Sequence, residues 1–277
     1  HSTPTDLVIV VGDVTSTLAC SIVAKKMHIK VAHVEGGIRS WDISMPEEIN
    51  RMVTDSISDY FFTTSRTANE NLLREGKKDD QIFFVGNTMI DTLYANMQRL
   101  KKPEVWDQYN LQPQKFFLMT LHRPSNVDDP ANLKILLSVI ASSAEDLAVV
   151  FPVHPRTRKN LAAFQDEIQK IHLVDPLSYL EFIYLVKNSK GVITDSGGIT
   201  EETTVLGIPC ITLRNSTERP ETCTVGTNEL IGTKPENIRP AIKKMLSNNW
   251  KKGSTPELWD GKAAERTIEI ILKCLRV

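Results

Sequence analysis

The sequence has few features that would point to a metal centre, a membrane or a nucleic acid. Its four cysteines (Cys20, Cys210, Cys223 and Cys274) are scattered, with no Cys-x-x-Cys pair, which favours a reducing, cytoplasmic compartment. No apolar run is long enough to cross a bilayer, so we expect a soluble chain. The net charge of -1 and the pI near 6.7 argue against a basic surface for nucleic acid or anionic lipid.

Two signatures of nucleotide chemistry are also missing. There is no Gly-x-Gly-x-x-Gly fingerprint followed by a ribose-binding acid, so we expect no nicotinamide cofactor. No Asp-x-Asp pair suggests a metal site either. With 41% hydrophobic and 24% charged residues, the 277 residues are typical of an ordered globular protein and are enough for two domains.

The most informative stretch is 193–202, where an apolar strand runs through a glycine turn into a helix. The free N–H groups and the positive dipole end of such a helix favour an anion above Ser196, Gly197 and Gly198. Glu202, about one turn into the helix, is placed to accept hydrogen bonds from the two hydroxyls of a ribose. A nucleotide diphosphate fits this pattern. The alternative is a plain strand-to-helix turn in which Ser196 only caps the helix.

The first hundred residues alternate between strands and helices, which predicts a doubly wound parallel sheet. Asp13 and Glu35 follow the first two strands, at the sheet edge where open α/β folds bind ligands. The helix after Asp13 carries Leu18, Ile22 and Val23 at helical spacing. The strands are expected at 7–11, 30–34, 60–63 and 82–85, and the helices at 15–27, 46–58, 65–75 and 88–100.

The second half predicts another sheet, joined to the first by a linker at 101–114 that has two prolines and no sustained period. His122 follows its first strand, where a histidine is more often functional than structural. Phe182 falls off the core stripe of its helix, so its ring faces solvent or ligand, or is buried on another face. The expected strands are 116–121, 147–153, 171–174 and 210–213, the expected helices 132–144, 157–168, 237–246 and 262–275, and the expected loop 214–226.

The start of the chain is unusual. It begins at His1 and enters a strong strand at Leu7 almost at once. We therefore expect a fragment whose earlier strand–helix units are absent, which leaves the first domain incomplete.

Six short motifs in a fixed order resemble one family, the non-hydrolysing UDP-N-acetylglucosamine 2-epimerases. They are Gly12-Asp13, His33-Val34-Glu35-Gly36-Gly37-Ile38-Arg39, Pro46-Glu47-Glu48-Ile49-Asn50-Arg51, His122-Arg123, Asp195 to Glu202, and Thr217-Glu218-Arg219-Pro220-Glu221. The resemblance covers the whole chain. Two departures are a missing Gly-x-Arg-Pro-Glu opening segment and Gly36 in place of the commoner alanine.

The resemblance implies an α/β, GT-B-like fold of two Rossmann-like, doubly wound domains. They would span residues 1–100, as a partial domain, and 115–256, as the UDP-binding domain, with a helix at 257–277 packed back on the first. It also implies a cytoplasmic homodimer that holds a UDP-sugar between the domains and serves cell-envelope polysaccharide biosynthesis. No nucleic acid, membrane, cofactor or metal is implied.

The resemblance assigns roles to individual residues. Asp13, Glu35, Glu47 and His122 match the family's catalytic positions. The residues that match UDP contacts are Leu177, Phe182, Ser196, Gly197, Gly198, Glu202 and Arg219, where the apolar Leu177 would offer only its backbone. Arg123 and His154 match part of a second, activating substrate site. For Glu47, complementing the helix dipole is the alternative.

The implied reaction inverts C2 of the sugar by elimination of UDP to 2-acetamidoglucal and re-addition. Because clustered acids repel, we expect at least one of them to have a raised pKa. Three alternatives remain: a GT-B glycosyltransferase, a 2-epimerase of a related UDP-diacetamido sugar, and a truncated UDP-binding protein without activity.

Overall fold

The computed structural model describes residues 5–153, 158, 161 and 168–275. The chain folds into two compact units. Unit 1 comprises His1–Ala95 and Pro256–Val277, and unit 2 comprises Asn96–Thr255. No helix among the described residues combines the length and the apolar character that a membrane span requires.

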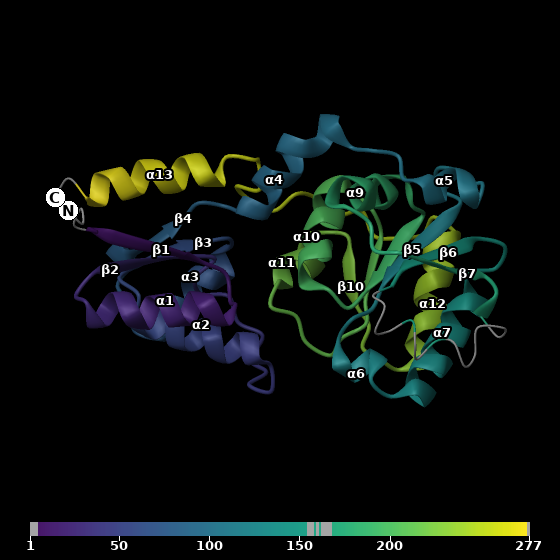
Figure 1. Ribbon diagram of the computed structural model, residues 1–277, viewed down its shortest axis with the longest axis horizontal. Coiled ribbons are helices and arrows are strands. Elements are labelled where there is room, and N and C mark those ends of the chain that lie inside the picture. Colours follow the sequence, from purple (N-terminus) through teal and green to yellow (C-terminus); the bar gives the residue numbers. More distant parts are fainter. Residues whose placement is uncertain (1–4, 154–157, 159–160, 162–167, 276–277) are drawn as a thin grey trace. The chain divides into compact units, whose positions relative to one another are not determined.

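Unit 1 is built on a parallel four-stranded sheet in the order β1-β2-β3-β4 (Figure 1). The strands are β1 (Leu7–Val11), β2 (Lys30–Val34), β3 (Tyr60–Thr63) and β4 (Ile82–Phe84), which confirms the four predicted from apolar runs. Val11 pairs with Val34, so the ends of the first two strands are level. Loops that follow β1 and β2 therefore leave the sheet side by side.

Helices cover both faces of this sheet. Helices α1 (Thr15–Lys26), α2 (Pro46–Ile57) and α3 (Arg66–Arg74) lie on one face and α13 (Ala263–Cys274) on the other (Figure 1). Side chains alternate across the strands accordingly. Val31 packs with α1, whereas Ala32 and Phe62 pack with Ile271 of α13. Helix α4 (Thr88–Asn96) ends at the boundary with unit 2.

Helix α1 is confirmed, but the apolar residues that indicated it do not form its buried face. Ile22 and Val23 are exposed, whereas the small side chains Thr17, Ser21 and Ala24 are buried. These three residues recur at helical spacing, and Thr17 Oγ1 donates to the carbonyl oxygen of Val11 at 2.7 Å. The helix therefore approaches the sheet through its small residues rather than through its larger apolar ones.

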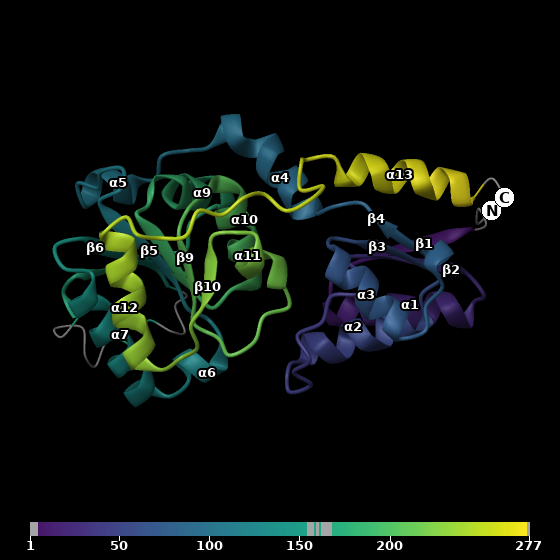
Figure 2. The same ribbon diagram turned by 180° about the vertical axis from the view of Figure 1, so that it is seen from behind.

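Unit 2 contains a six-stranded parallel sheet in the order β10-β9-β8-β5-β6-β7. The strands are β5 (Phe116–Thr120), β6 (Ala148–Pro152), β7 (Ile171–Val174), β8 (Gly191–Thr194), β9 (Cys210–Thr212) and β10 (Asn228–Leu230). Helices α7 (Pro130–Ser143) and α12 (Pro235–Leu246) cover one face, and α9 (Tyr179–Asn188) and α10 (Gly197–Leu206) the other (Figure 2).

Two expectations for this unit need correction, and one strand is additional. The expected linker 101–114 belongs to unit 2 and contains α5 (Glu104–Gln108), because the Trp106 ring packs edge-on against Phe116 and Tyr184 at centroid distances of 5.8 and 5.3 Å. The expected loop 214–226 contains α11 (Pro220–Thr224), which begins at a proline. Strand β10 was not expected. The expected helix 157–168 lies almost entirely outside the described residues.

Replacing Ile271 with alanine should lower the free energy of unfolding by about 2–5 kcal/mol, because its side chain fills the core between α13 and the unit 1 sheet. Its neighbour Leu272 is 49% exposed and provides the matched control. Urea denaturation of Ile271→Ala and Leu272→Ala measures the difference. Equal losses in the two variants would contradict this packing.

Candidate functional site

The carboxyl ends of β1 and β2 bring Asp13 and Glu35 to neighbouring positions in unit 1. The sheet hydrogen bonds continue to the residues next to them, because Gly12 N donates to Val34 O at 3.0 Å and Glu35 N donates to Phe62 O at 2.9 Å. Both acids are partly buried. Glu35 has a φ of 70°, a conformation that non-glycine residues adopt mainly where the surroundings enforce it.

Helix α2 holds Asp13 in place. Arg51 Nη2 lies 2.5 Å from Asp13 Oδ2, and Arg51 Nε donates to the same oxygen at 3.0 Å. Asn50 Nδ2 also donates to the Asp13 carbonyl oxygen at 2.8 Å. The first turn of this helix carries Glu47, so α2 links two of the three predicted acids.

Successive acids at the start of α2 have different surroundings. Glu48 is fully buried and accepts hydrogen bonds from Ser40 N, Trp41 N and Arg51 Nη1. Glu47 is partly buried, and its carboxylate makes no hydrogen bond or ion pair with another described residue. Glu48 therefore fixes the loop before α2, whereas the carboxylate of Glu47 is available to bind a ligand.

Beneath these loops lies a buried network that sequence reasoning did not find. Asp55 of α2 lies 2.6 Å from His33 Nδ1 and 2.7 Å from Arg39 Nη1, and it accepts from Gly37 N at 3.0 Å. His33 Nε2 in turn lies 2.9 Å from the carbonyl oxygen of Gly12. Asp55 thereby ties the turn that carries Asp13 to the turn that follows Glu35.

The charges in this network stabilise each other. Burial acts to lower the pKa of His33, but the Asp55 carboxylate and its hydrogen bond outweigh burial and raise it. Burial acts in the opposite direction on Asp55, where His33 and Arg39 lower the pKa. Both ring nitrogens of His33 face oxygen acceptors, which is the arrangement that an imidazolium requires.

In unit 2, the glycine turn lies where the sequence places it. Ser196 is the N-cap residue of α10, but its side chain makes no capping hydrogen bond, and its N–H donates to Thr194 Oγ1 at 2.9 Å. A Cβ at Gly197 would lie 2.3 Å from Glu218 Oε1, so a larger residue there would have to displace this carboxylate. The N–H groups of the first helical turn have no carbonyl partner within the helix and suit an anion.

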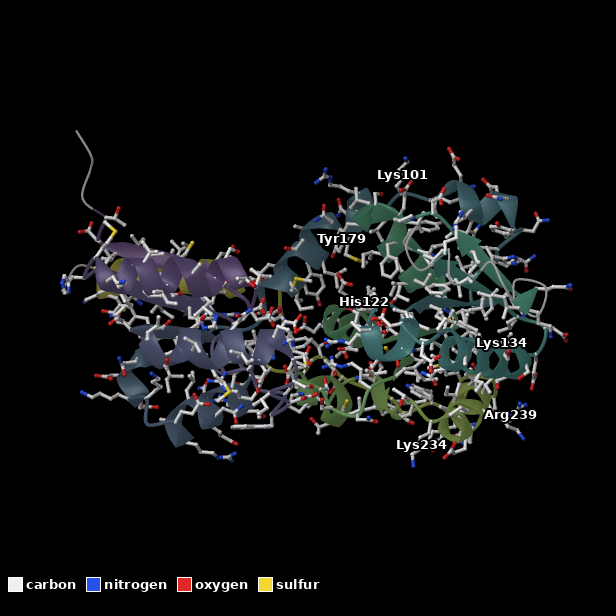
Figure 3. The ribbon with its side chains drawn as sticks, turned by 60° about the horizontal axis from the view of Figure 1, so that its bottom comes forward. Lys101, His122, Lys134, Tyr179, Lys234 and Arg239 are labelled. Carbon is white, nitrogen blue, oxygen red and sulfur yellow. The ribbon has the colours of Figure 1, made fainter. Side chains whose placement is uncertain are left out.

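His122 is oriented by a buried carboxylate, Asp195, which sequence reasoning did not select. Asp195 Oδ1 lies 2.9 Å from His122 Nδ1, and the carboxylate also accepts from Arg123 N and Asn126 Nδ2 at 3.0 Å. Burial opposes ionisation, but these bonds, led by that of His122, lower the pKa of Asp195. The His122 side chain is 61% exposed (Figure 3), so Nε2 is the ring atom left for a substrate. The one sequence signal was the position of Asp195 at the end of β8.

The predicted ribose and diphosphate side chains are nearly buried. Glu202 is 4% exposed, and burial raises its pKa to about 7, although a hydrogen bond with Tyr179 acts in the opposite direction. Arg219 Nε lies 2.8 Å from Oε1 of the buried Glu201. Arg219 is therefore held against α10 by an ion pair.

The remaining predicted contacts lie along α9 and the segment before it. Phe182 and Leu177 are both partly buried.

Arg123, predicted for a second site, donates through Nε to the carbonyl oxygen of Asp195 at 3.2 Å. His154, its predicted companion, lies outside the described residues.

The charge on His33 predicts a pH-dependent stability. Because its pKa is raised on folding, its contribution is complete below the unfolded value of about 6.5 and is lost as the pH rises through the folded value. The difference in free energy of unfolding between the wild type and His33→Gln should therefore be largest at pH 6 and shrink towards alkaline pH. Urea denaturation across this range measures it.

The matched control is His28→Gln, which removes an exposed histidine from the same unit. Its free energy of unfolding should stay close to that of the wild type, because the side chain is exposed. A constant difference for His33→Gln over the whole range would contradict a charged His33.

Comparisons with known proteins agree with this arrangement. A family model described as UDP-N-acetylglucosamine 2-epimerase matches residues 1–272. The chain is 44% identical to the UDP-N-acetylglucosamine 2-epimerase of Methanocaldococcus jannaschii over 278 residues, which cover 96% of this chain and 75% of that protein. It is 40% identical to the UDP-2,3-diacetamido-2,3-dideoxy-D-glucuronate 2-epimerase of Pseudomonas aeruginosa over 243 residues, which cover 86% of this chain and 67% of that protein.

A solved structure gives the same result. The crystal structure of the M. jannaschii UDP-GlcNAc 2-epimerase in complex with UDP-GlcNAc and UDP matches with a TM-score of 0.83 and 44% identity, and the match covers 97% of this chain and 76% of that one. The two Rossmann-like α/β units have the GT-B fold of such neighbours, as predicted. The chain belongs to the UDP-N-acetylglucosamine 2-epimerase family.

Proposed function

We propose that this protein converts UDP-N-acetylglucosamine into UDP-N-acetylmannosamine by inverting C2 of the sugar. The observation that carries the proposal is the 44% identity, across nearly the whole chain, to the M. jannaschii UDP-N-acetylglucosamine 2-epimerase. The crystal structure of that protein is a complex with UDP-GlcNAc and UDP. The side chains and turns described above supply chemistry that fits the reaction. The protein would act as a cytoplasmic homodimer.

Unit 2 supplies the groups for UDP. The Ser196 hydroxyl, the N–H groups at Gly197 and Gly198 and the charge of Arg219 stabilise the diphosphate, and losing one such preorganised donor costs roughly 3 kcal/mol in a transition state. Glu202 accepts from the ribose hydroxyls. Phe182 lies beside the uracil, and the segment at Leu177 contacts it through the backbone.

The chemistry requires UDP to leave before C2 can invert. No carbonyl acidifies the C2–H bond, so a carboxylate cannot remove this proton directly at a useful rate. Cleavage of C1–O sends the bonding electrons to the UDP oxygen and leaves an oxocarbenium-like ring. A base then takes the C2 proton and forms 2-acetamidoglucal. Protonation of C2 on the opposite face and re-addition of UDP at C1 give the epimer.

Unit 1 supplies the acids for the sugar. Asp13, Glu35 and Glu47 stabilise positive charge at the ring and exchange the C2 proton. Arg51 fixes the orientation of Asp13. From unit 2, His122 offers Nε2 to the bridging phosphate oxygen while Asp195 holds Nδ1. Arg123 and His154 belong, in this proposal, to a second site for activating UDP-N-acetylglucosamine.

A second candidate substrate is a UDP-2,3-diacetamido-2,3-dideoxy-uronate. The specific observation in its favour is the 40% identity to the P. aeruginosa 2-epimerase of that class. Parallel assays with the two UDP-sugars distinguish the candidates, because the true substrate should have the higher kcat/KM by at least an order of magnitude.

Asp13→Asn and Glu35→Gln should abolish the incorporation of solvent deuterium at C2, because each removes a carboxylate from the acid cluster. UDP binding should persist, since both acids belong to unit 1. Proton NMR of the sugar in deuterated water measures exchange, and calorimetry measures UDP binding.

The control is Asp80→Asn, which changes an exposed acid of unit 1 and should exchange like the wild type. Normal exchange in both active-site variants would remove the acid cluster from the mechanism.

Asp195→Asn should lower kcat by about a hundredfold or more while KM for the UDP-sugar changes little, because the amide no longer fixes the ring orientation and tautomer of His122. The pH profile of kcat should change as well. Steady-state kinetics at several pH values provide the test, with thermal unfolding as a check on folding. A folded variant with unchanged kcat and pH profile would contradict the role of Asp195 in orienting His122.

A further inference from the structure

A cavity of about 410 Å³ lies in unit 2 at the amino ends of three strands. Lys190, Pro209 and Thr227 line it, and they immediately precede β8, β9 and β10 respectively. The glycine turn and Asp195 instead follow the carboxyl end of β8. The cavity therefore lies at the opposite edge of the sheet from the candidate site. Its volume is within the range of about 300–1,000 Å³ that is usual for small-molecule pockets.

Three lysines give this cavity a positive lining. Lys190 and Lys251 are partly buried and Lys252 is exposed, and no acidic residue is among the described residues that line the cavity. Lys190 Nζ donates to Asn248 Oδ1 at 2.5 Å. Lys251 Nζ donates to the carbonyl oxygen of Cys223 at 2.5 Å. Because both acceptors are neutral, each ammonium group keeps its full charge and has further N–H donors for a ligand.

These lysines have no carboxylate partner in the part of the chain that the structure describes. Glu229, whose charge acts on Lys251, forms its ion pair with Lys244 at 3.3 Å instead. Burial lowers the pKa of Lys251, and the charge of Glu229 does not outweigh this effect. The cavity is therefore lined by cations whose charge no protein group neutralises directly.

Helix dipoles account for part of this positive charge. The carboxyl ends of α9, α10 and α12 lie at the cavity, where Lys190 follows α9, Gly207 caps α10 and Asn248 follows α12. Each helix end is equivalent to about half a negative charge, so the three ends offset about half of the three lysine charges. Complementing the dipoles therefore explains some of the lysine charge, but a net charge of about one to two remains for an anion.

We propose that this cavity binds a small phosphate ester, whose phosphate group lies among the three lysines and whose organic group lies against Pro209 and Trp250. A phosphate monoester carries a charge of about −1.5 to −2 near pH 7, which matches the remaining positive charge. Lysine binds phosphate as a point charge and needs no bidentate geometry. Pro209 and Trp250 line the cavity and are partly buried, so a free phosphate ion would leave this apolar wall uncovered. The inference goes beyond the proposed function and does not depend on it.

Calorimetry with phenyl phosphate and with inorganic phosphate tests the site on the full chain. Both probes carry a phosphate group, but only phenyl phosphate has an apolar group to place against Pro209 and Trp250. Phenyl phosphate should bind about tenfold more tightly, because its ring buries apolar surface. Raising the salt concentration from about 0.05 to about 0.5 M should weaken the binding of both probes, because salt screens charges that are partly exposed.

Variants place the binding in the cavity. Lys190→Gln and Lys252→Gln should each weaken phenyl phosphate binding about tenfold, because each removes a charged donor. The matched control is Lys243→Gln, which makes the same change in net charge at an exposed lysine of α12 that does not line the cavity. It should bind like the wild type. Thermal unfolding confirms that each variant is folded.

Saturating UDP should leave phenyl phosphate binding unchanged, because the glycine turn lies at the other edge of the sheet. Four results would overturn the site. They are no binding of phenyl phosphate at millimolar concentration, equal affinity for the two probes, cavity variants that bind like Lys243→Gln, and displacement of phenyl phosphate by UDP. Each of them would leave the proposed epimerase function standing.

Discussion

In each unit a buried aspartate accepts several hydrogen bonds from the loops that carry the functional side chains. Asp55 holds His33, Arg39 and Gly37 in unit 1, and Asp195 holds the backbone and side chain of His122 and the side chain of Asn126 in unit 2. A buried carboxylate is tolerated only when charged or hydrogen-bonding groups offset its desolvation. These hydrogen bonds hold the loops in place, and His122 takes its orientation from Asp195.

On two helices, two successive acidic residues have different roles. On α2, Glu48 forms a buried ion pair with Arg51 while Glu47 remains without such a bond among the described residues. On α10, Glu201 pairs with Arg219, and the next residue, Glu202, is the proposed ribose acceptor. Neighbouring helical residues point about 100° apart, so one acid reaches the supporting ion pair and the other reaches a different surface. Sequence alone does not show which member of each pair supports the loop.

The sequence predicted structure well where that structure depends on residues close together in the chain. Apolar runs located the four strands of the unit 1 sheet and every strand of the unit 2 sheet except β10, and the glycine turn before α10 was found from its residues alone. The failures share a cause, which is that they depend on contacts between distant segments. His33 and Asp55 are 22 residues apart, Trp106 packs an expected linker into unit 2, and His122 and Asp195 are 73 residues apart. The buried face of α1 was missed because small residues, rather than large ones, face the sheet.

Together, these features support the proposal that the protein holds a nucleotide by backbone donors and a buried acid and acts on the sugar with the acids of unit 1. The central claim of the proposed mechanism is that the bond between C1 and the UDP oxygen breaks in every turnover. Positional isotope exchange tests this most directly, with UDP-N-acetylglucosamine labelled with oxygen-18 in the bridging position. The account predicts that the label scrambles into the non-bridging β-phosphate oxygens as C2 inverts. Inversion with the label retained in the bridge would contradict it.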